Sequence, residues 1–345
     1  MNVATLLLMI GGTVLVGLYG ILVGLLLLGI DRKLAARMQA RVGPRIRQPF
    51  IDIAKLLCKD CVVPAHAVRC IFTWAPVIAL ASSLMVLLYL PIGSMPPLLG
   101  GLAGTFGDVV LVMYLLTVPA LAMVAGGFAS GSPYATVGAQ REMVTMISYE
   151  FPLAIAIIAV AWRLSVAGIT DPFTLVSIAG ITSGITIWGV VGIPGIVGCI
   201  LLLVALAWVT PAEVSRVPCD TPEAETELAG GLLVEYSGRH LAMFTVAQGA
   251  KTLAMASLAV AIFLPWNISW AVPLDPAVAL LVDGLFFILK VIAVAFFSMT
   301  LLRVGMARFR ITQVVTLYWG YIAAVALAGM ILLVVDALLG LGVAA

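Results

Sequence analysis

Eight long apolar runs constrain what this chain can fold into more than any other feature. A helix needs about 20 mostly apolar residues to cross a bilayer. The predicted spans lie at 4–30, 70–92, 107–129, 147–168, 184–210, 248–267, 276–300 and 313–341. Because 63% of the residues are hydrophobic and only 10% are charged, water is a poor solvent for this chain. We therefore expect an all-α membrane protein with eight transmembrane helices in one polytopic domain, residues 1–345.

The basic residues predict how the spans are oriented. All but two of the 18 lysines and arginines lie in the loops that join spans 1 and 2, 3 and 4, 5 and 6, and 7 and 8, with Lys251 counted at the boundary between the 5–6 loop and span 6. The positive-inside rule places these four loops in the cytoplasm and both termini outside. The two exceptions, Arg163 and Lys290, lie within predicted spans. The net charge of +2 gives no basic field that would bind nucleic acid.

One cytoplasmic loop is unusually acidic for so apolar a chain. Its sequence "CDTPEAETELAGGLLVEYSG" carries Asp220, Glu223, Glu225, Glu227 and Glu235. One interpretation is a solvated surface loop. The alternative is a proton relay, because the loop is too apolar and glycine-rich for a plain surface segment, and carboxylates crowded in a poor solvent disfavour each other's ionisation. If residues 222–235 are helical, Glu223 and Glu227 share a face.

Other ionisable residues lie near or within the predicted spans. Glu142 and Glu150 flank the cytoplasmic start of span 4, and Asp283 and Lys290 lie in span 7. The last two are seven residues apart, which places them on one helical face within about 10 Å. Charged groups inside a membrane are functional candidates, so we expect Lys290 to face a carboxylate or a water-filled path. Three further acids are interpreted as outer-edge residues without a role: Asp171, Asp275 and Asp336.

The first cytoplasmic loop contains an amphipathic segment. Phe50, Ile53, Ala54 and Leu57 fall on one helical face. Such a helix either lies at the membrane surface or lines a cavity and docks a partner.

Cysteine and histidine spacing in the same loop resembles a metal site. Cys58, Cys61, His66 and Cys70 read as C-x2-C-x4-H-x3-C, a spacing close to that of zinc ligands. No glycine turn separates them, however, and Cys70 begins a span, so we expect no metal and free thiols in a reducing compartment. Walker A, GxGxxG, iron–sulfur and paired haem-ligand patterns are missing from the sequence. The chain is therefore expected to hold no cofactor of its own.

Four stretches carry a family resemblance. They read "ARMQARVGPR", "ISYEF", "PEAETELAGGLLVEYSG" and "RVGMARFRITQ". In this order they resemble signatures of the respiratory complex I subunit 1 family, also called the H-type subunit. The resemblance implies a membrane anchor beneath an electron-transfer arm, with a chain of acids that couples redox events to proton movement.

Site residues follow from the spans and the resemblance together. The expected proton path comprises Glu142, Glu150, Asp220, Glu223, Glu225, Glu227, Glu235, Asp283 and Lys290. The residues expected to face partner subunits are Arg41, Arg45, Asp52, Lys59, Arg303, Arg308 and Arg310.

Departures from the family pattern indicate a branch. Quinone-reducing members typically read Gly-Pro-Asn where this chain has Gly43-Pro44-Arg45, and they carry Glu-Tyr where it reads Val-Ala-Gln-Gly at 246–249. They also carry Pro-Arg-x-Arg-x-Asp-Gln where residues 307–313 read Ala-Arg-Phe-Arg-Ile-Thr-Gln. The stretch "GGLLVEYSG" resembles the corresponding sequence of the membrane-bound [NiFe] hydrogenases, including the energy-converting and formate-hydrogenlyase types, more than that of the quinone-reducing members.

The hydrogenase resemblance implies a set of partners. We expect hydrogenase large and small subunits, a ferredoxin-like iron–sulfur subunit and an antiporter-like membrane subunit, in the lipid of a prokaryotic inner membrane. The [4Fe–4S] clusters and the [NiFe] centre would belong to these partners. Two alternatives stay open. One is the quinone-site subunit of an NADH or reduced-deazaflavin:quinone oxidoreductase. The other is a stand-alone secondary ion transporter, which the concentration of charge on cytoplasmic loops speaks against.

Overall fold

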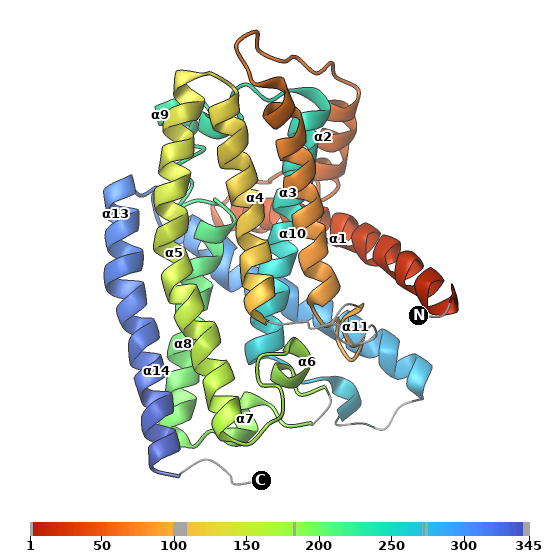
Figure 1. The fold of residues 1–345 in the computed structure, drawn as a ribbon, viewed down its shortest axis with the longest axis vertical. Helices are drawn as coiled ribbons and strands as arrows, with labels where there is room; N and C mark the ends of the chain where they lie inside the picture. The colour runs from red at the N-terminus through yellow and green to blue at the C-terminus, as the bar shows by residue number, and fades with distance from the viewer. Residues whose placement is uncertain (1–2, 99–108, 182–183, 271, 273–274, 341–345) are drawn as a thin grey trace.

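The computed structural model describes residues 3–98, 109–181, 184–270, 272 and 275–340. Eight helical segments in these ranges are long and apolar enough to cross a membrane (Figure 1). They run over Met9–Met38, Arg69–Tyr89, Val109–Ala129, Pro133–Val166, Ile193–Glu213, Gly238–Trp270, Val278–Gly305 and Ile311–Leu338. The expectation of an all-α membrane protein with eight spans is confirmed. The predicted start of span 3 at 107 and end of span 8 at 341 lie outside the described residues.

The helices are named as in Figure 1. The elements are α1 (Val3–Met38), α2 (Gln48–Leu57), α3 (Arg69–Tyr89), α4 (Val109–Ala129), α5 (Pro133–Val166), α6 (Leu175–Ile178), α7 (Ile187–Val190), α8 (Ile193–Glu213), α9 (Glu225–Leu228), α10 (Gly238–Phe263), α11 (Pro276–Ala295), α12 (Leu301–Gly305), α13 (Ile311–Thr316) and α14 (Ala323–Leu338). Span 7 passes from α11 to α12 through the π-helical turn η4 (Phe296–Thr300). Span 8 passes from α13 to α14 through the π-helical turn η5 (Leu317–Ile322).

Helix α5 is much longer than the span predicted from the sequence. Its 34 residues correspond to about 51 Å, whereas the hydrocarbon core is about 30 Å thick. Its first turns therefore project beyond the bilayer, and most of the predicted 130–146 loop is helical. These turns pack on the acidic loop, because a Cβ at Gly138 would lie 2.8 Å from the Leu232 nitrogen. Glu142 consequently sits on a helix and points into the protein.

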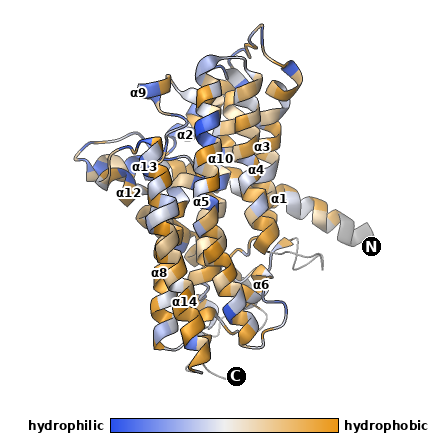
Figure 2. Ribbon diagram, turned by 60° about the vertical axis from the view of Figure 1, so that its left-hand side comes forward, coloured by the Kyte–Doolittle hydropathy of each residue, from blue (hydrophilic) through white to orange (hydrophobic). Residues whose placement is uncertain are grey.

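The loops that carry the basic residues meet at one end of the bundle. Figure 1 shows α2 and α9 at the same end, with α6 and α7 at the other, and Figure 2 shows hydrophilic residues around α2, α9 and α13. Backbone contacts join these loops: Phe309 N donates to Pro218 O at 3.0 Å, and Val62 N donates to Ser237 Oγ at 3.0 Å. Which end faces the cytoplasm stays a prediction.

The acidic loop is not one helix. Only Glu225–Leu228 (α9) and the 3-10 turn Gly231–Leu233 (η2) are helical within it. Ala229, Gly230 and Gly231 have φ values of 54°, 100° and 53°, so three successive left-handed residues end α9. The expectation that Glu223 and Glu227 share a helical face is therefore wrong.

The amphipathic helix of the first loop is present as α2, which packs on α1 and α10. Phe50 and Ile53 are half-buried, as the pattern predicts, but Ala54 and Leu57 are exposed. The helix touches the bundle mainly through its first two turns, where Pro49 is buried. The predicted apolar face packs on the bundle in its first half, and its second half is left for the lipid or the partner that the two alternatives name.

A buried ion pair fastens the end of the bundle opposite α2. Arg163 of α5 lies 3.1 Å from Asp336 of α14, and their side chains are 5% and 0% exposed. Arg163 also donates to Val190 O at 2.7 Å. Asp336 accepts the backbone N–H groups of Gly192 (3.0 Å) and Gly195 (3.2 Å) at the start of α8. Asp336 therefore ties three helices together, and the interpretation of this residue as an edge acid without a role is wrong.

Candidate functional site

A second buried ion pair lies toward the other end of the bundle. Lys251 Nζ of α10 lies 3.0 Å from Glu213 Oε1, at the last residue of α8, and their side chains are 2% and 0% exposed. The two groups do not meet in hydrogen-bond geometry, because Nζ and both Glu213 oxygens have no hydrogen-bond partner among the described residues. The pair is therefore a close electrostatic contact with unused hydrogen-bonding capacity, and it can accept water or a proton donor.

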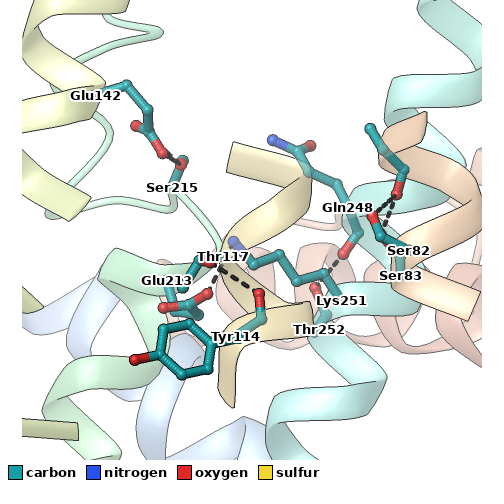
Figure 3. A network of polar contacts seen from close by, with 11 residues as sticks. Ser82, Ser83, Tyr114, Thr117, Glu142, Glu213, Ser215, Gln248, Lys251 and Thr252 are labelled. Atoms are coloured by element: carbon teal, nitrogen blue, oxygen red, sulfur yellow. Dashed lines mark hydrogen bonds and ion pairs between the residues drawn. The ribbon is translucent and has the colours of Figure 1, made fainter. Parts of the chain in front are cut away.

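Glu142 is a second buried carboxylate in this region of the bundle. It is 1% exposed, and Ser215 Oγ lies 3.4 Å and 3.5 Å from its two oxygens. Figure 3 shows the Glu142 side chain reaching toward Ser215, with Lys251 extended toward Glu213. We call Glu142, Glu213, Ser215 and Lys251 the inner acid cluster. The cluster contains two carboxylates and one ammonium, so it can hold a proton on one carboxylate without a net buried charge.

Further buried polar atoms lack a protein partner, both next to Glu150 on α5 and in the acidic loop with the segment before it. Within the described part of the chain they include Tyr149 Oη, Arg216 Nε, Thr221 Oγ1 and Asp220 Oδ1. Buried groups of this kind are normally satisfied by ordered water. The arrangement is therefore suited to a hydrated path between the loop and the cluster.

Arginines hold the acidic loop on the bundle. Arg308 lies 2.8 Å from Asp220, and Arg141 lies 2.5 Å from Glu227. Arg308 also donates to Thr226 Oγ1 at 3.2 Å. These contacts are partly solvated, so each contributes about 1 kcal/mol or less. They position the loop against α5 and the segment before α13.

Glu223 and Arg216 are half-buried at the base of the acidic loop. Gln248 Nε2 of α10 donates to Glu223 Oε1 at 3.1 Å. Burial raises the pKa of the Glu223 carboxyl, although the Arg216 charge and the Gln248 hydrogen bond oppose the shift. Burial likewise raises the pKa of Asp220 against the opposing charge of Arg308, and it lowers the pKa of Arg216. The two acids therefore hold protons more readily than solvated carboxyls do.

These raised pKa values predict a pH dependence of the loop. Stability contributed by a protonated, half-buried Glu223 is fully present below the ordinary carboxyl range and is lost as pH rises through its raised pKa. We expect amide hydrogen exchange in residues 219–235, corrected for the intrinsic rate, to speed up over that window. A Glu223→Gln variant, which is always neutral, should reduce the dependence. An unchanged pH profile in that variant would show that another group controls the loop.

Glu150, Glu225 and Glu235 lie outside the inner acid cluster. Glu150 is half-buried on α5, directly after the fully buried Tyr149, and Glu235 is also half-buried. Glu225 is exposed at the start of α9. The structure therefore separates the predicted acids into two groups. Some lie close to the inner acid cluster, whereas Glu150, Glu225 and Glu235 reach the outer surface of the protein.

Asp283 and Lys290 each have local partners. Asp283 accepts from Ser269 N at 3.1 Å and from Ser269 Oγ at 2.6 Å. Lys290 Nζ donates to the carbonyls of Leu264 and Trp266, both at 2.8 Å. These carbonyls follow the end of α10, so Lys290 acts as a cationic cap for that helix. The expected carboxylate partner is replaced by two backbone carbonyls.

The cap predicts a structural phenotype for Lys290. A Lys290→Met variant loses two charge-assisted hydrogen bonds at a half-buried position and should be destabilised by about 1–3 kcal/mol. Thermal unfolding of the purified protein measures this, with Lys290→Arg as the control that keeps a cationic donor. Ion translocation per electron should not change. Unchanged stability combined with lost translocation would return Lys290 to the proton path.

Sequence reasoning missed Glu213. It lies three residues beyond the predicted end of span 5 at 210, in "VTPAEVSR". The predicted start of span 6 at 248 puts Lys251 close to a loop, yet this residue is 1% exposed inside α10. The available signal was a lone acid just beyond the end of one predicted span and a lone lysine just inside the start of the next.

Comparison with known proteins identifies the family. The family model described as NADH dehydrogenase matches residues 11–334. The chain belongs to this family. The H-type subunit of the NADH-quinone oxidoreductase of Anoxybacillus flavithermus is 33% identical over 91% of this chain and 90% of its own length. The corresponding protein of Syntrophotalea carbinolica is 32% identical over 84% of both chains.

A solved structure has the same fold. A chain from the membrane-bound sulfane sulfur reductase, an archaeal respiratory membrane complex, matches with a TM-score of 0.79 and 27% identity. The match covers 94% of this chain and 99% of that chain. This NADH dehydrogenase family member is thus an H-type membrane subunit, as in complex I, of a respiratory complex.

The Glu-Tyr-Ser-Gly motif of this family member has a structural explanation. Tyr236 stacks on Phe72 with ring centroids 4.1 Å apart, and its hydroxyl donates to Phe72 O at 3.2 Å. Gly238 has a φ of 56°, and a Cβ there would lie 2.7 Å from Asp60 O. The motif therefore locks the start of α10 to α3 and to the first cytoplasmic loop.

The predicted partner-facing residues divide into two groups. Arg41, Arg45, Lys59 and Arg310 are exposed. The other three make ion pairs within the chain: Asp52 with Arg32 (3.3 Å), Arg303 with Asp31 (2.9 Å) and Arg308 with Asp220 (2.8 Å). The first group stays available for a partner, whereas the second also holds together the loops at the end of the bundle that carries α2 and α9.

The zinc-like pattern does not gather in space. Among the described residues, no three His, Cys, Asp or Glu side chains lie close enough to hold a metal ion. Cys58 and Cys70 are exposed free thiols, and Cys61 is half-buried.

Proposed function

We propose that this chain is the membrane-anchoring, ion-coupling subunit of a membrane-bound hydrogenase complex. The observation that carries the proposal is the inner acid cluster beneath the acidic loop, in which the pKa values of Asp220 and Glu223 are raised. The 3.0 Å Glu213–Lys251 pair and the 1% exposed Glu142 place titratable groups in the protein interior. Such groups are costly to bury, and inside a membrane protein they usually mark a proton or ion path. Protons would pass from the acidic loop through the cluster toward a neighbouring membrane subunit.

The partners in this proposal supply the redox chemistry. Hydrogenase large and small subunits would carry the [NiFe] centre and [4Fe–4S] clusters, with a ferredoxin-like iron–sulfur subunit as a further electron carrier. An antiporter-like subunit would continue the ion path within the membrane. The exposed Arg41, Arg45, Lys59 and Arg310 give the peripheral arm a cationic docking face.

A close helix crossing supports the hydrogenase branch over the quinone branch. A Cβ at Gly24 of α1 would lie 2.7 Å from the carbonyl carbon of Gly249 in α10. The two backbones therefore touch where the quinone-linked relatives carry the bulkier Glu-Tyr pair. A large side chain at 249 would require α1 to move away. The structural neighbour also supports this branch. Its chain has the same fold and belongs to the membrane-bound sulfane sulfur reductase, a complex that is not named for quinone.

The second candidate is a quinone-linked complex, which the 32–33% identity to NADH-quinone oxidoreductase subunits favours. Quinone in a lipid extract of the purified complex, together with inhibition by quinone-site compounds, would support it. A stand-alone transporter would purify as a single stable polypeptide with ion flux of its own.

The proposal predicts a separation of electron transfer from ion movement. Glu213→Gln in the whole complex should abolish most ion translocation while hydrogen oxidation with an artificial dye continues. Translocation is measured with everted vesicles and a pH-sensitive fluorophore, and sodium-dependent flux identifies the ion. The control is Asp171→Asn, an exposed left-handed residue at which asparagine is well tolerated. Normal translocation by Glu213→Gln would remove the inner acid cluster from the path.

The exposed acids need a separate comparison. Glu225→Gln should reduce translocation less than Glu213→Gln does, because water reaches the exposed position and can replace the carboxyl. Equal losses in the two variants would show that the path begins at α9.

A further inference from the structure

Ser215 has a backbone conformation that serine rarely adopts. Its φ is 51°, and it directly follows the cap of α8. Ser215 N donates to Ala212 O at 3.0 Å, and Arg216 N donates to Pro211 O at 2.8 Å. This is the Schellman arrangement, in which the left-handed position is usually glycine. A serine there is strained relative to glycine, so its side chain requires an explanation.

The side chain of Ser215 points at Glu142. Its Oγ lies 3.4 Å and 3.5 Å from the two carboxyl oxygens, and Ser215 itself is 4% exposed (Figure 3). Glu142 has no other side-chain hydrogen-bond partner among the described residues. A hydroxyl can donate to an ionised carboxylate and accept from a protonated one, so the contact is possible in both states of Glu142.

A matched site elsewhere in the chain lacks such a side chain. Ala40 has a φ of 57° after the end of α1, where Ala40 N donates to Arg37 O and Arg41 N donates to Ala36 O. The backbone arrangement is the same as at Ser215, but the residue is exposed and carries no polar group. Ala40 therefore isolates the effect of backbone strain from the effect of the hydroxyl.

We propose that Ser215 is a positioning residue that orients the Glu142 carboxyl toward the Glu213–Lys251 pair in both protonation states. The proposal rests on the proposed function for its transport consequences. Ser215 lies just after the end of α8, two residues from Glu213, and from there it would hold the Glu142 side chain in a fixed orientation. The strained serine is then retained for its hydroxyl, because glycine would fit the backbone better.

Three substitutions separate strain from chemistry. Ser215→Gly removes both the strain and the hydroxyl, Ser215→Ala keeps the strain and removes the hydroxyl, and Ser215→Asn keeps a polar side chain that tolerates the left-handed region. The melting temperature should be highest for the glycine variant and lowest for the alanine variant. Translocation per electron should fall about twofold in both, because Oγ–O separations of 3.4 Å and 3.5 Å make a weaker contact than an ordinary hydrogen bond, and should be largely kept in the asparagine variant. Ala40→Gly should raise stability without changing translocation.

The opposite pattern would overturn the proposal. If translocation follows stability, with Ser215→Gly equal to or better than the native protein, the serine has only a structural role. Infrared difference spectroscopy gives a readout independent of transport. The carboxyl band assigned by its loss in Glu142→Gln should shift in Ser215→Gly and stay unchanged in Ala40→Gly. A native complex that does not move ions would refute the proposed function, while the infrared shift would still test the Ser215–Glu142 contact.

Discussion

A Lys251→Met variant should lose about 3–5 kcal/mol of stability, because it leaves the carboxylate of Glu213 buried without its cation. The two side chains are 2% and 0% exposed and lie 3.0 Å apart. Methionine fills a similar volume without a charge, so the loss reports electrostatics more than packing. Thermal unfolding and the yield of assembled complex in lipid nanodiscs measure the effect. Ion translocation in the remaining assembled fraction should be lost.

Two controls test whether the pair is the cause. The double variant Lys251→Met/Glu213→Gln should recover most of the stability and none of the translocation, because both charges are then removed. Arg141→Met removes the cation from Glu227, whose side chain is 52% exposed, and should cost about 1 kcal/mol or less. A single Lys251→Met variant as stable as the native protein would mean that water already solvates Glu213.

Asp336→Ala should be destabilised by a similar amount, about 3–5 kcal/mol. It leaves the 5% exposed Arg163 unpaired and removes the acceptor of two backbone N–H groups at the start of α8. Asp336→Asn should be milder, because the amide oxygen still accepts those N–H groups. Stability is again measured by thermal unfolding in nanodiscs.

The Arg163–Asp336 pair should differ from the Glu213–Lys251 pair in its effect on transport. Arg163 lies 21 residues after Glu142 on α5, which is about 31 Å along the helix axis. Translocation per electron in the assembled fraction of the Asp336 variants should therefore equal that of the native protein. An Asp336→Asn variant that is stable but no longer translocates ions would place the Arg163–Asp336 pair on the ion path.

The sequence alone determined the class of this protein. Eight apolar runs of spanning length left no arrangement but a helical membrane protein, because each buried backbone group in lipid must find its partner within its own helix. The acidic run was also visible, and four signatures in order indicated the family. These are local properties, since apolar length, charge and short motifs can be read without knowing which helices are neighbours.

Only the tertiary structure decided which charges meet. Asp283 and Lys290 share a helical face, yet each binds groups on other segments: Ser269 in one case, and the carbonyls of Leu264 and Trp266 in the other. Glu213 and Lys251 are 38 residues apart in the chain and form a buried pair because α8 and α10 pack together. Helical periodicity gives the direction of a side chain on its own helix but not the partner packed against it. The sequence therefore determined that charged residues enter the membrane region. The packing of the helices determined that Glu213 pairs with Lys251 and Asp336 with Arg163.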